Sequence, residues 1–293
     1  MKVRIFCVCG DFLVVLWWRW RPRSACRRRR ITKNFKHTMR RNLFVLVLVA
    51  VSALVSAAQS SPVLIGRRGC AGGVENSVEA YREAVARGFK MIEGHVRLTA
   101  DSVFVTSHDG KTQRLGGRMS VEKSRLDSLR SEVYTQTRED SVTYTGGRIA
   151  TVEEFLTICR DGGVTAVLHL KNIPKADDVS RLPELVELID RVSGREKVLV
   201  LTASEPYARF LHERYPDLPL MLQVEKKWRE LHDVAVELGV PVDLEVTLAT
   251  PEMLELYAST GTPVCVWTVN DASQAASLAS QGVAYIITDT LRP

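Results

Sequence analysis

The sequence predicts an α/β fold, and within that class a (β/α)8 TIM barrel, on three observations. Short apolar runs alternate with helical patterns from position 164 onward, which is typical of parallel βαβ units. Polar and ionisable residues follow the apolar runs one after another, as catalytic residues follow the strands of a barrel. No glycine-rich dinucleotide motif or P-loop follows these runs, which argues against the alternative, an open doubly wound nucleotide-binding sheet.

The N-terminal segment differs from the rest of the chain in charge. The whole chain of 293 residues has a formal net charge of +6. Its first 58 residues hold 13 Lys and Arg against one acid, Asp11, a charge of +12, which leaves −6 for the remainder. The basic character belongs to the N-terminal segment, so nucleic acid is not an expected partner.

Residues 39–58 are interpreted as a secretory signal peptide. Arg40 and Arg41 form its positive end, residues 43–55 its apolar part, and small residues precede position 59 as a cleavage site. The apolar part is too short for a comfortable membrane span. We therefore expect an exported protein, periplasmic or extracellular, without a stable membrane span after cleavage; an uncleaved anchor is the alternative.

Residues 1–38 are unusual upstream of a signal peptide, because they carry clusters of tryptophan and arginine without an amphipathic period. We interpret them as a non-native or untranslated upstream segment, with translation starting at Met39. The folded domain is expected at residues 62–293. It holds Cys70, Cys159 and Cys265, an odd number without metal-motif spacing, so we expect buried free thiols rather than disulfides or a zinc cluster.

The first half of the domain is less regular than the second. The apolar run 62–66 predicts a strand, helical spacing predicts a helix over 75–87, and the stretch 91–109 begins with a second apolar strand. A third apolar run follows a turn. The polar segment 110–147 predicts a long connection with some helix over one end of the fold. A helix then restarts over 151–159, with Thr and Glu at capping-box positions.

The second half repeats strand and helix. Strands are predicted at 164–170, 197–203, 218–224, 242–246, 263–269 and 284–288. Helices are predicted at 180–193, 204–214, 226–238, 251–259 and 271–280. With the three earlier runs this makes nine candidate strands, so we expect one of them to lie outside the main sheet.

The stretch 91–109 carries the first indication of a site. Glu93 and His95 are two residues apart on a predicted strand, so their side chains point to one side. The returning chain brings His108 to the same end. A carboxylate with two imidazoles is suited to metal binding or acid–base chemistry, although scattered polar residues at a strand edge would show the same spacing.

The other predicted strand ends add ionisable groups to the same mouth of the barrel. The full set is Arg67, Arg68, Glu93, His95, His108, His169, Lys171, Gln223, Glu225, Glu245, Trp267 and Asn270. Burying so many charges without partners is costly. The set therefore favours a functional site over a purely structural barrel.

Short motifs run through the domain in a fixed order. They are Gly66-Arg67-Arg68-Gly69, Glu75-Asn76-Ser77, Glu93-Gly94-His95, His108-Asp109, Thr151-Val152-Glu153-Glu154, His169-Leu170-Lys171, Val266-Trp267-Thr268-Val269-Asn270 and Thr288-Asp289. Each is weak alone, but the ordered set is specific. From about Val63 to the C-terminus the chain resembles the glycerophosphodiester phosphodiesterases, a TIM-barrel family of metal-dependent phosphodiester hydrolases.

The resemblance implies an active site that departs from the family pattern. The family uses two histidines as general acid and base; Arg67 stands in the place of the first, and His108 matches the second. The family's three carboxylate metal ligands correspond here to Glu93, His95 and His169.

The resemblance also implies a substrate-binding set. Arg68 and Lys171 match the family's phosphate-binding cations, and Trp267 lines the mouth near the substrate, although core packing is an equally good reading of this tryptophan.

Two imidazoles and one carboxylate suit Zn²⁺, Mn²⁺ or Fe²⁺ better than Ca²⁺ or Mg²⁺. We therefore expect a divalent metal, and the resemblance implies a phosphoric diester hydrolase that cleaves a glycerophosphodiester-type substrate to an alcohol and a phosphomonoester. The alternative is a catalytically impaired barrel that binds a small phosphodiester or another anion, because Arg67 cannot act as a neutral base.

Overall fold

The computed structural model describes residues 8–9, 12–13, 61–173, 175, 177–225 and 228–293. The chain divides into two compact units, Met1–Ala58 and Gln59–Pro293. In the first unit the two-residue strands β1 (Val8–Cys9) and β2 (Phe12–Leu13) pair antiparallel. The predicted signal peptide and the predicted start at Met39 lie outside the described residues and stay predictions.

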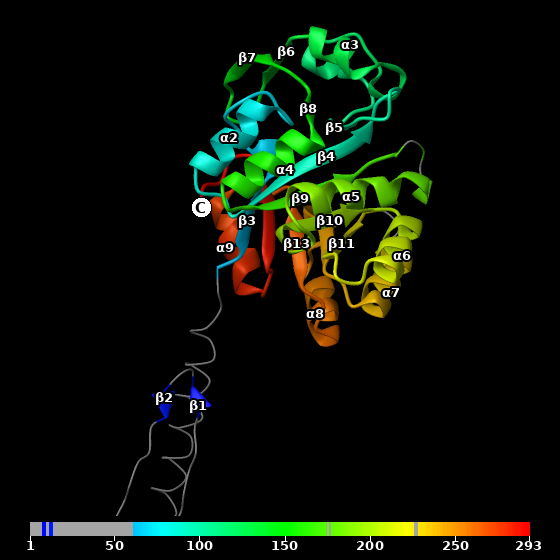
Figure 1. Cartoon of the computed structure of the whole chain (residues 1–293). Helices are drawn as coiled ribbons and strands as arrows, with labels where there is room; N and C mark the ends of the chain where they lie inside the picture. Colours follow the sequence, from blue (N-terminus) through cyan, green and yellow to red (C-terminus); the bar gives the residue numbers. More distant parts are fainter. Residues whose placement is uncertain (1–7, 10–11, 14–60, 174, 176, 226–227) are drawn as a thin grey trace, which may run out of the picture. The chain divides into compact units, whose positions relative to one another are not determined.

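A closed ring of eight parallel strands forms the centre of the second unit (Figure 1). Its strands are β3 (Val63–Gly66), β4 (Met91–Leu98), β9 (Thr165–Leu170), β10 (Val198–Thr202), β11 (Leu220–Val224), β12 (Val242–Glu245), β13 (Val264–Trp267) and β14 (Tyr285–Thr288). Each strand pairs with the next, and β14 pairs with β3 to close the ring. The predicted (β/α)8 TIM barrel is confirmed.

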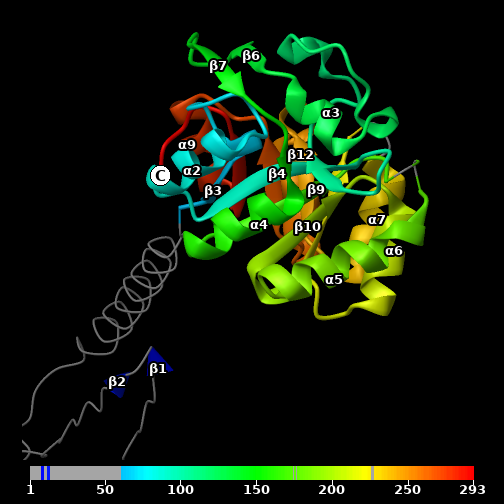
Figure 2. The same cartoon turned by 45° about the horizontal axis from the view of Figure 1, so that its top comes forward.

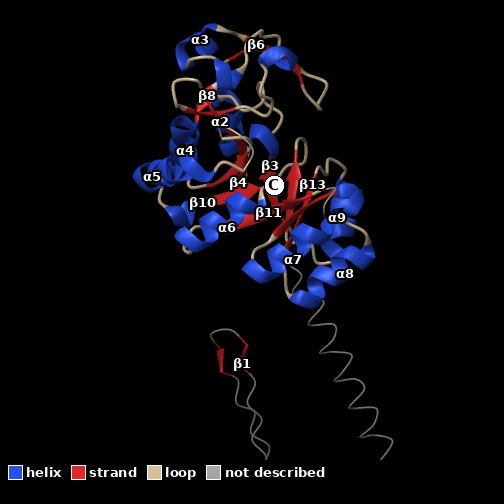
Figure 3. Cartoon of the chain, turned by 90° about the vertical axis from the view of Figure 1, so that its right-hand side faces the viewer, coloured by secondary structure: helices blue, strands red, loops and turns tan. Residues whose placement is uncertain are grey.

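Helices between consecutive strands cover the outside of the ring (Figure 3). They are α2 (Val78–Ala86), α4 (Val152–Asp161), α5 (Leu182–Val192), α6 (Glu205–Arg214), α7 (Trp228–Leu238), α8 (Pro251–Thr260) and α9 (Ala272–Ser280). Most lie within two residues of their predicted ranges. The first begins three residues late, because Ser77 caps it by accepting a hydrogen bond from the Ala80 N–H. None of the described helices is long and apolar enough to cross a membrane.

Short 3-10 turns connect several of these elements. They are η1 (Arg67–Gly69), η2 (Thr112–Leu115), η3 (Val121–Lys123), η4 (Val179–Arg181), η5 (Arg195–Lys197) and η6 (Val246–Leu248). The first of them, η1, directly follows β3 at the mouth of the barrel. It therefore places both of its arginines next to the ends of the strands.

The connection from β4 to α4 is the long one that the sequence predicts, and it lies over one end of the barrel (Figure 2). It holds β5 (Phe104–Thr106), α3 (Leu126–Ser131), the hairpin of β6 (Tyr134–Thr137) and β7 (Thr143–Gly147), and β8 (Ala150–Thr151). The ninth predicted strand is β5, which pairs antiparallel with β4 and stays outside the ring. The hairpin was not predicted, because its strands are mostly polar.

Apolar side chains fill both sides of the ring. Inside it, a small cluster includes Ile65, Val167, Leu201 and Met221, and a larger cluster joins the outer face of the strands to the helices. Strands that are buried on both faces have continuous apolar runs, which explains why the sequence indicated them so clearly. The long connection has its own apolar cluster, which includes Leu129.

One acidic side chain, Asp243 on β12, lies fully buried inside the ring. Gln223 Nε2 donates to Asp243 Oδ2 over 3.2 Å, and Oδ1 has no partner among the described residues. Burial raises the pKa of Asp243 to about 8, against the hydrogen bond from Cys265. At neutral pH the group is therefore a neutral acid.

We expect Asp243→Asn to gain stability over the wild type as the pH rises from 5 to 8. The pKa of Asp243 in the folded state lies above the ordinary value of 3.8. The stability that its proton contributes is therefore fully present below pH 3.8 and is lost as the pH rises to about 8. The difference in the free energy of unfolding between Asp243→Asn and the wild type should grow by about 1.4 kcal/mol per pH unit, a few kcal/mol in all. Urea unfolding at both pH values measures it, with the exposed Asp161→Asn as control; a pH-independent difference would refute the assignment.

Candidate active site

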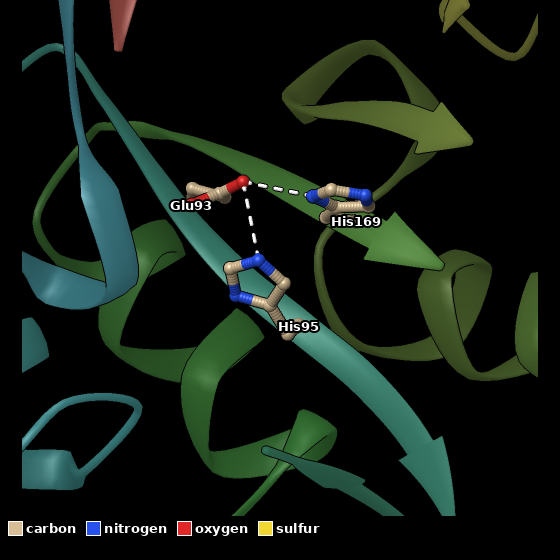
Figure 4. Close-up of side chains that lie close together, drawn as sticks. All are labelled: Glu93, His95 and His169. Atoms are coloured by element: carbon tan, nitrogen blue, oxygen red, sulfur yellow. Dashed lines mark hydrogen bonds and ion pairs between the residues drawn. The ribbon is translucent and has the colours of Figure 1, made fainter. Parts of the chain in front are cut away.

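Glu93, His95 and His169 converge inside the mouth of the barrel (Figure 4). The first two are two residues apart on β4, and the parallel register sets His95 opposite His169 on β9. Glu93 Oε1 lies 2.9 Å from His169 Nδ1 and 3.5 Å from His95 Nε2. All three side chains are buried. The convergence of Glu93 and His95 that their spacing predicts is therefore present, and His169, the third ligand that the resemblance implies, joins them.

The protonation states of this group suit a metal. Burial lowers the pKa of His95 well below its ordinary value, and burial with the charge of Lys171 lowers that of His169 to about 4. Burial raises the pKa of Glu93, but the hydrogen bond with His169 and the charge of Arg67 outweigh it, and the pKa falls to about 2. At neutral pH the group thus offers two neutral imidazoles and a carboxylate, the forms that bind a metal without losing a proton.

Unused polar atoms support the same conclusion. Glu93 Oε2 and His95 Nδ1 are buried and have no hydrogen-bond partner in the part of the chain that the structure describes. One donor atom from each of Glu93, His95 and His169 lies within 4.8 Å of the others. A compact set of nitrogen and oxygen donors like this one fits a divalent metal ion.

His108 stands beside the three predicted ligands. Its ring meets that of His95 edge-on, with the ring centroids 4.7 Å apart. Its Nδ1 lies 2.7 Å from Asp109 Oδ1, so Nδ1–H donates a hydrogen bond to Asp109 and Nε2 is left as the basic nitrogen. Burial and the charge of Arg68 lower the pKa of His108 to about 4. At neutral pH this imidazole can accept a proton.

The two arginines of η1 have different surroundings. Arg67 Nη1 lies 3.0 Å from Asp289 Oδ2. Arg68 has a left-handed backbone, with φ of 53°, and its Nη1 lies 2.8 Å from Glu75 Oε2. Burial raises the pKa of Glu75, but Arg114 and Arg68 outweigh it and hold that pKa well below its usual range, so Glu75 is ionised.

A cavity unites most of the predicted site residues. It is lined by Arg67, Glu93, His95, His108, His169, Lys171, Gln223, Glu225, Trp267 and Ile287. Lys171 Nζ lies 3.1 Å from His169 Nε2, and burial lowers the pKa of Lys171 to about 8. The Trp267 indole N–H has no partner among the described residues. A cavity with two basic side chains and neutral imidazoles can take a phosphate ester beside a metal.

Comparison with known proteins agrees with this geometry. Residues 59–292 match the family model of the glycerophosphoryl diester phosphodiesterase family. The chain belongs to this family. A similar curated protein, "Probable glycerophosphodiester phosphodiesterase 2" of Mycobacterium tuberculosis, is 28% identical, with 73% of this chain and 81% of the relative covered.

Solved structures of the same fold agree. A phosphodiesterase of Oleispira antarctica in complex with the product sn-glycerol-3-phosphate has a TM-score of 0.66 at 19% identity, with 78% of this chain and 93% of that chain covered. A glycerophosphodiester phosphodiesterase of Agrobacterium tumefaciens has a TM-score of 0.64 at 18% identity, with 78% and 96% covered. These similarities confirm the barrel, and the family match confirms the resemblance and the hydrolase class.

The phosphodiesterase barrel does not bring every predicted residue into the cavity. Arg68 is buried against Glu75 and does not line the cavity, so its predicted contact with substrate stays a prediction. Asn270 serves the fold: its Oδ1 accepts hydrogen bonds from the Asp289 N–H and the Thr288 hydroxyl.

Some residues that organise the phosphodiesterase site were missed from the sequence. Glu75 and Asp289 had a signal, because both belong to the family motifs, yet they were given no role. Arg138 had no signal, because it lies in the polar connection. The structure nevertheless places its guanidinium against Asp289.

Proposed function

We propose that the protein hydrolyses a glycerophosphodiester-type substrate to an alcohol and a phosphomonoester with the help of a divalent transition metal. Glu93, His95 and His169 would hold the metal. The observation that carries the proposal is the convergence of these three residues beside His108, in a cavity that also contains basic side chains. The match to the phosphodiesterase family supports the reaction class.

The basic residues of the cavity bind and orient the phosphate. Arg67 keeps its proton at any ordinary pH, and a guanidinium is suited to two parallel hydrogen bonds to phosphate oxygens. Lys171 adds a second positive charge. A bound metal supplies a Lewis acid that polarises a phosphoryl oxygen and acidifies water. Arg67 and Lys171 therefore offset the negative charge of the substrate.

Proton transfer falls to His108. Its Nε2 accepts a proton from the attacking water or returns one to the leaving alcohol, while Asp109 keeps the imidazole in the required tautomer. Arg67 stands where the family has its other histidine and cannot share this task. His108 then serves in both proton transfers, or water completes one of them.

A second candidate function is an anion-binding barrel without turnover. The arginine at position 67 favours it, because an ion pair with Asp289 holds this side chain as a fixed charge. Such a protein would bind a phosphate ester through Arg67 and Lys171 and release it unchanged.

An assay for released sn-glycerol 3-phosphate separates the two functions. The protein, purified without chelator, is incubated with glycerophosphocholine, and separately with bis-p-nitrophenyl phosphate, from which the release of p-nitrophenol is measured. We expect metal-dependent product release. A binder would release nothing, but sn-glycerol 3-phosphate would raise its melting temperature. Neither product nor a shift in melting temperature would contradict both functions.

We also propose export of the protein, as the composition of residues 39–58 suggests. N-terminal sequencing of the mature protein from the extracellular or periplasmic fraction tests this. A first residue near Gln59 is expected. A peptide from residues 1–38 in the mature protein would refute both the export signal and the predicted start at Met39.

A further inference from the structure

The hairpin of β6 and β7 turns one face toward the site. Along β6 the burial alternates, with Tyr134 and Gln136 buried and Thr135 and Thr137 exposed. Arg138 follows directly after the strand and is also buried. Residues two apart on an extended chain point the same way, so Gln136 and Arg138 are delivered together to the inner side of the hairpin.

The guanidinium of Arg138 contacts the carboxylate that holds Arg67. Arg138 Nη2 lies 3.1 Å from Asp289 Oδ1, while Arg67 Nη1 lies 3.0 Å from Asp289 Oδ2. Arg138 also donates to the backbone oxygens of Arg67 and Gly73, each over 3.4 Å. The side chains of Arg138 and Asp289 are each 1% exposed. Asp289 is therefore shared between one arginine from the hairpin and one from the cavity.

Gln136 repeats this arrangement on the neighbouring arginine. Its Nε2 donates to Glu75 Oε2 over 2.8 Å, and its Oε1 accepts from the Glu75 N–H over 3.0 Å. Glu75 in turn accepts from Arg68 over 2.8 Å. Each arginine of η1 is thus paired with a buried carboxylate, and each carboxylate is bound by a side chain from the inner side of the hairpin.

The charge balance shows why the contact matters for Arg67. Burial raises the pKa of Asp289, and the charges of Arg67 and Arg138 oppose that shift. Without Arg138, Arg67 would have to neutralise the buried carboxylate alone. Nη1 of Arg67 is already engaged by Asp289, while no described residue accepts from Nε or Nη2. With Asp289 neutralised from the other side, these N–H groups are left for an anion in the cavity.

We propose that Arg138 is a positioning residue for phosphate binding, which acts through Asp289 to hold the Arg67 guanidinium against the cavity. The inference rests on the proposed function for its ligand, a phosphate ester. The hairpin is then part of the site, although none of its residues lines the cavity.

Steady-state kinetics with bis-p-nitrophenyl phosphate, with inorganic phosphate as inhibitor, test this role. We expect Arg138→Met to raise both KM and the phosphate inhibition constant about tenfold, with a much smaller change in kcat. Arg138→Lys, which keeps the charge but not the forked geometry, should recover part of the loss. Thr135→Ala, on the exposed side of the same strand, is the control and should match the wild type. Unchanged constants in Arg138→Met would overturn the proposal.

A double-mutant cycle in thermal unfolding tests the coupling without any ligand. The variants are Arg138→Met, Arg67→Met and the two combined. Each single change leaves Asp289 with one partner, whereas the double change leaves a buried carboxylate with none. The fall in melting temperature should therefore exceed the sum of the single falls. A smaller or additive fall would refute the coupling of Arg138 to Arg67 through Asp289. If the wild type neither hydrolyses nor binds phosphate esters, the proposed function fails, and the cycle still tests the coupling of Arg138 to Arg67. If Arg138→Met does not fold, Arg138→Gln, which also removes the charge, takes its place.

Discussion

Replacement of His108 by glutamine is expected to lower kcat by about 10²–10⁴-fold, the usual contribution of a positioned acid–base group. The imidazole is the only one lining the cavity that is not a predicted metal ligand, among the residues that the structure describes. Glutamine keeps a hydrogen-bonding side chain of similar reach but cannot exchange a proton. Binding of phosphate should persist, because Arg67 and Lys171 are unchanged.

The measurement is kcat and the phosphate inhibition constant for wild type and variant. His212→Gln, on α6 and outside the cavity, serves as the control and should leave both values unchanged. Unaltered turnover in the His108 variant would remove this residue from the mechanism. Loss of phosphate binding together with turnover would show instead that His108 mainly holds the ligand.

Removal of the metal is the second large expected effect. Dialysis against a chelator should lower hydrolysis by about 10³-fold or more, because a metal contributes several kcal/mol to a phosphoryl transition state and each 1.4 kcal/mol is tenfold in rate. Elemental analysis of protein purified without chelator should find about one transition-metal ion per chain, as expected for a single site with three protein ligands. His169→Ala should lose both the ion and the activity.

Two comparisons sharpen this experiment. Zn²⁺, Mn²⁺ or Fe²⁺ should restore the dialysed enzyme and Ca²⁺ should not, because two imidazoles make a poor site for a hard cation. Glu255→Gln, an exposed carboxylate on α8, should keep full metal content. Recovery with Ca²⁺ alone would contradict the predicted preference, and full activity without any bound metal would contradict the site.

The barrel and the convergence of Glu93 with His95 were accessible from local rules, while the ligand role of His169 came from the family resemblance. Strands buried on both faces have continuous apolar sequences. Helices are indicated by the periodic spacing of their apolar residues and by caps such as Thr151 with Glu154. Glu93 and His95 face one way because a strand has a period of two. His169 meets them because catalytic side chains of a parallel barrel gather at the same ends of the strands.

The second layer of the site follows from contacts that no local rule encodes. Arg138 and Asp289 are 151 residues apart, and their meeting depends on how the hairpin packs over the mouth. Arg68 pairs with the buried carboxylate of Glu75 and does not line the cavity. The burial of Asp243 depends on which face of β12 looks inward. The periodic spacing of apolar residues in the sequence predicts each helix and strand. The partners of a charged side chain depend instead on how distant elements pair and pack, and only the tertiary structure determines that.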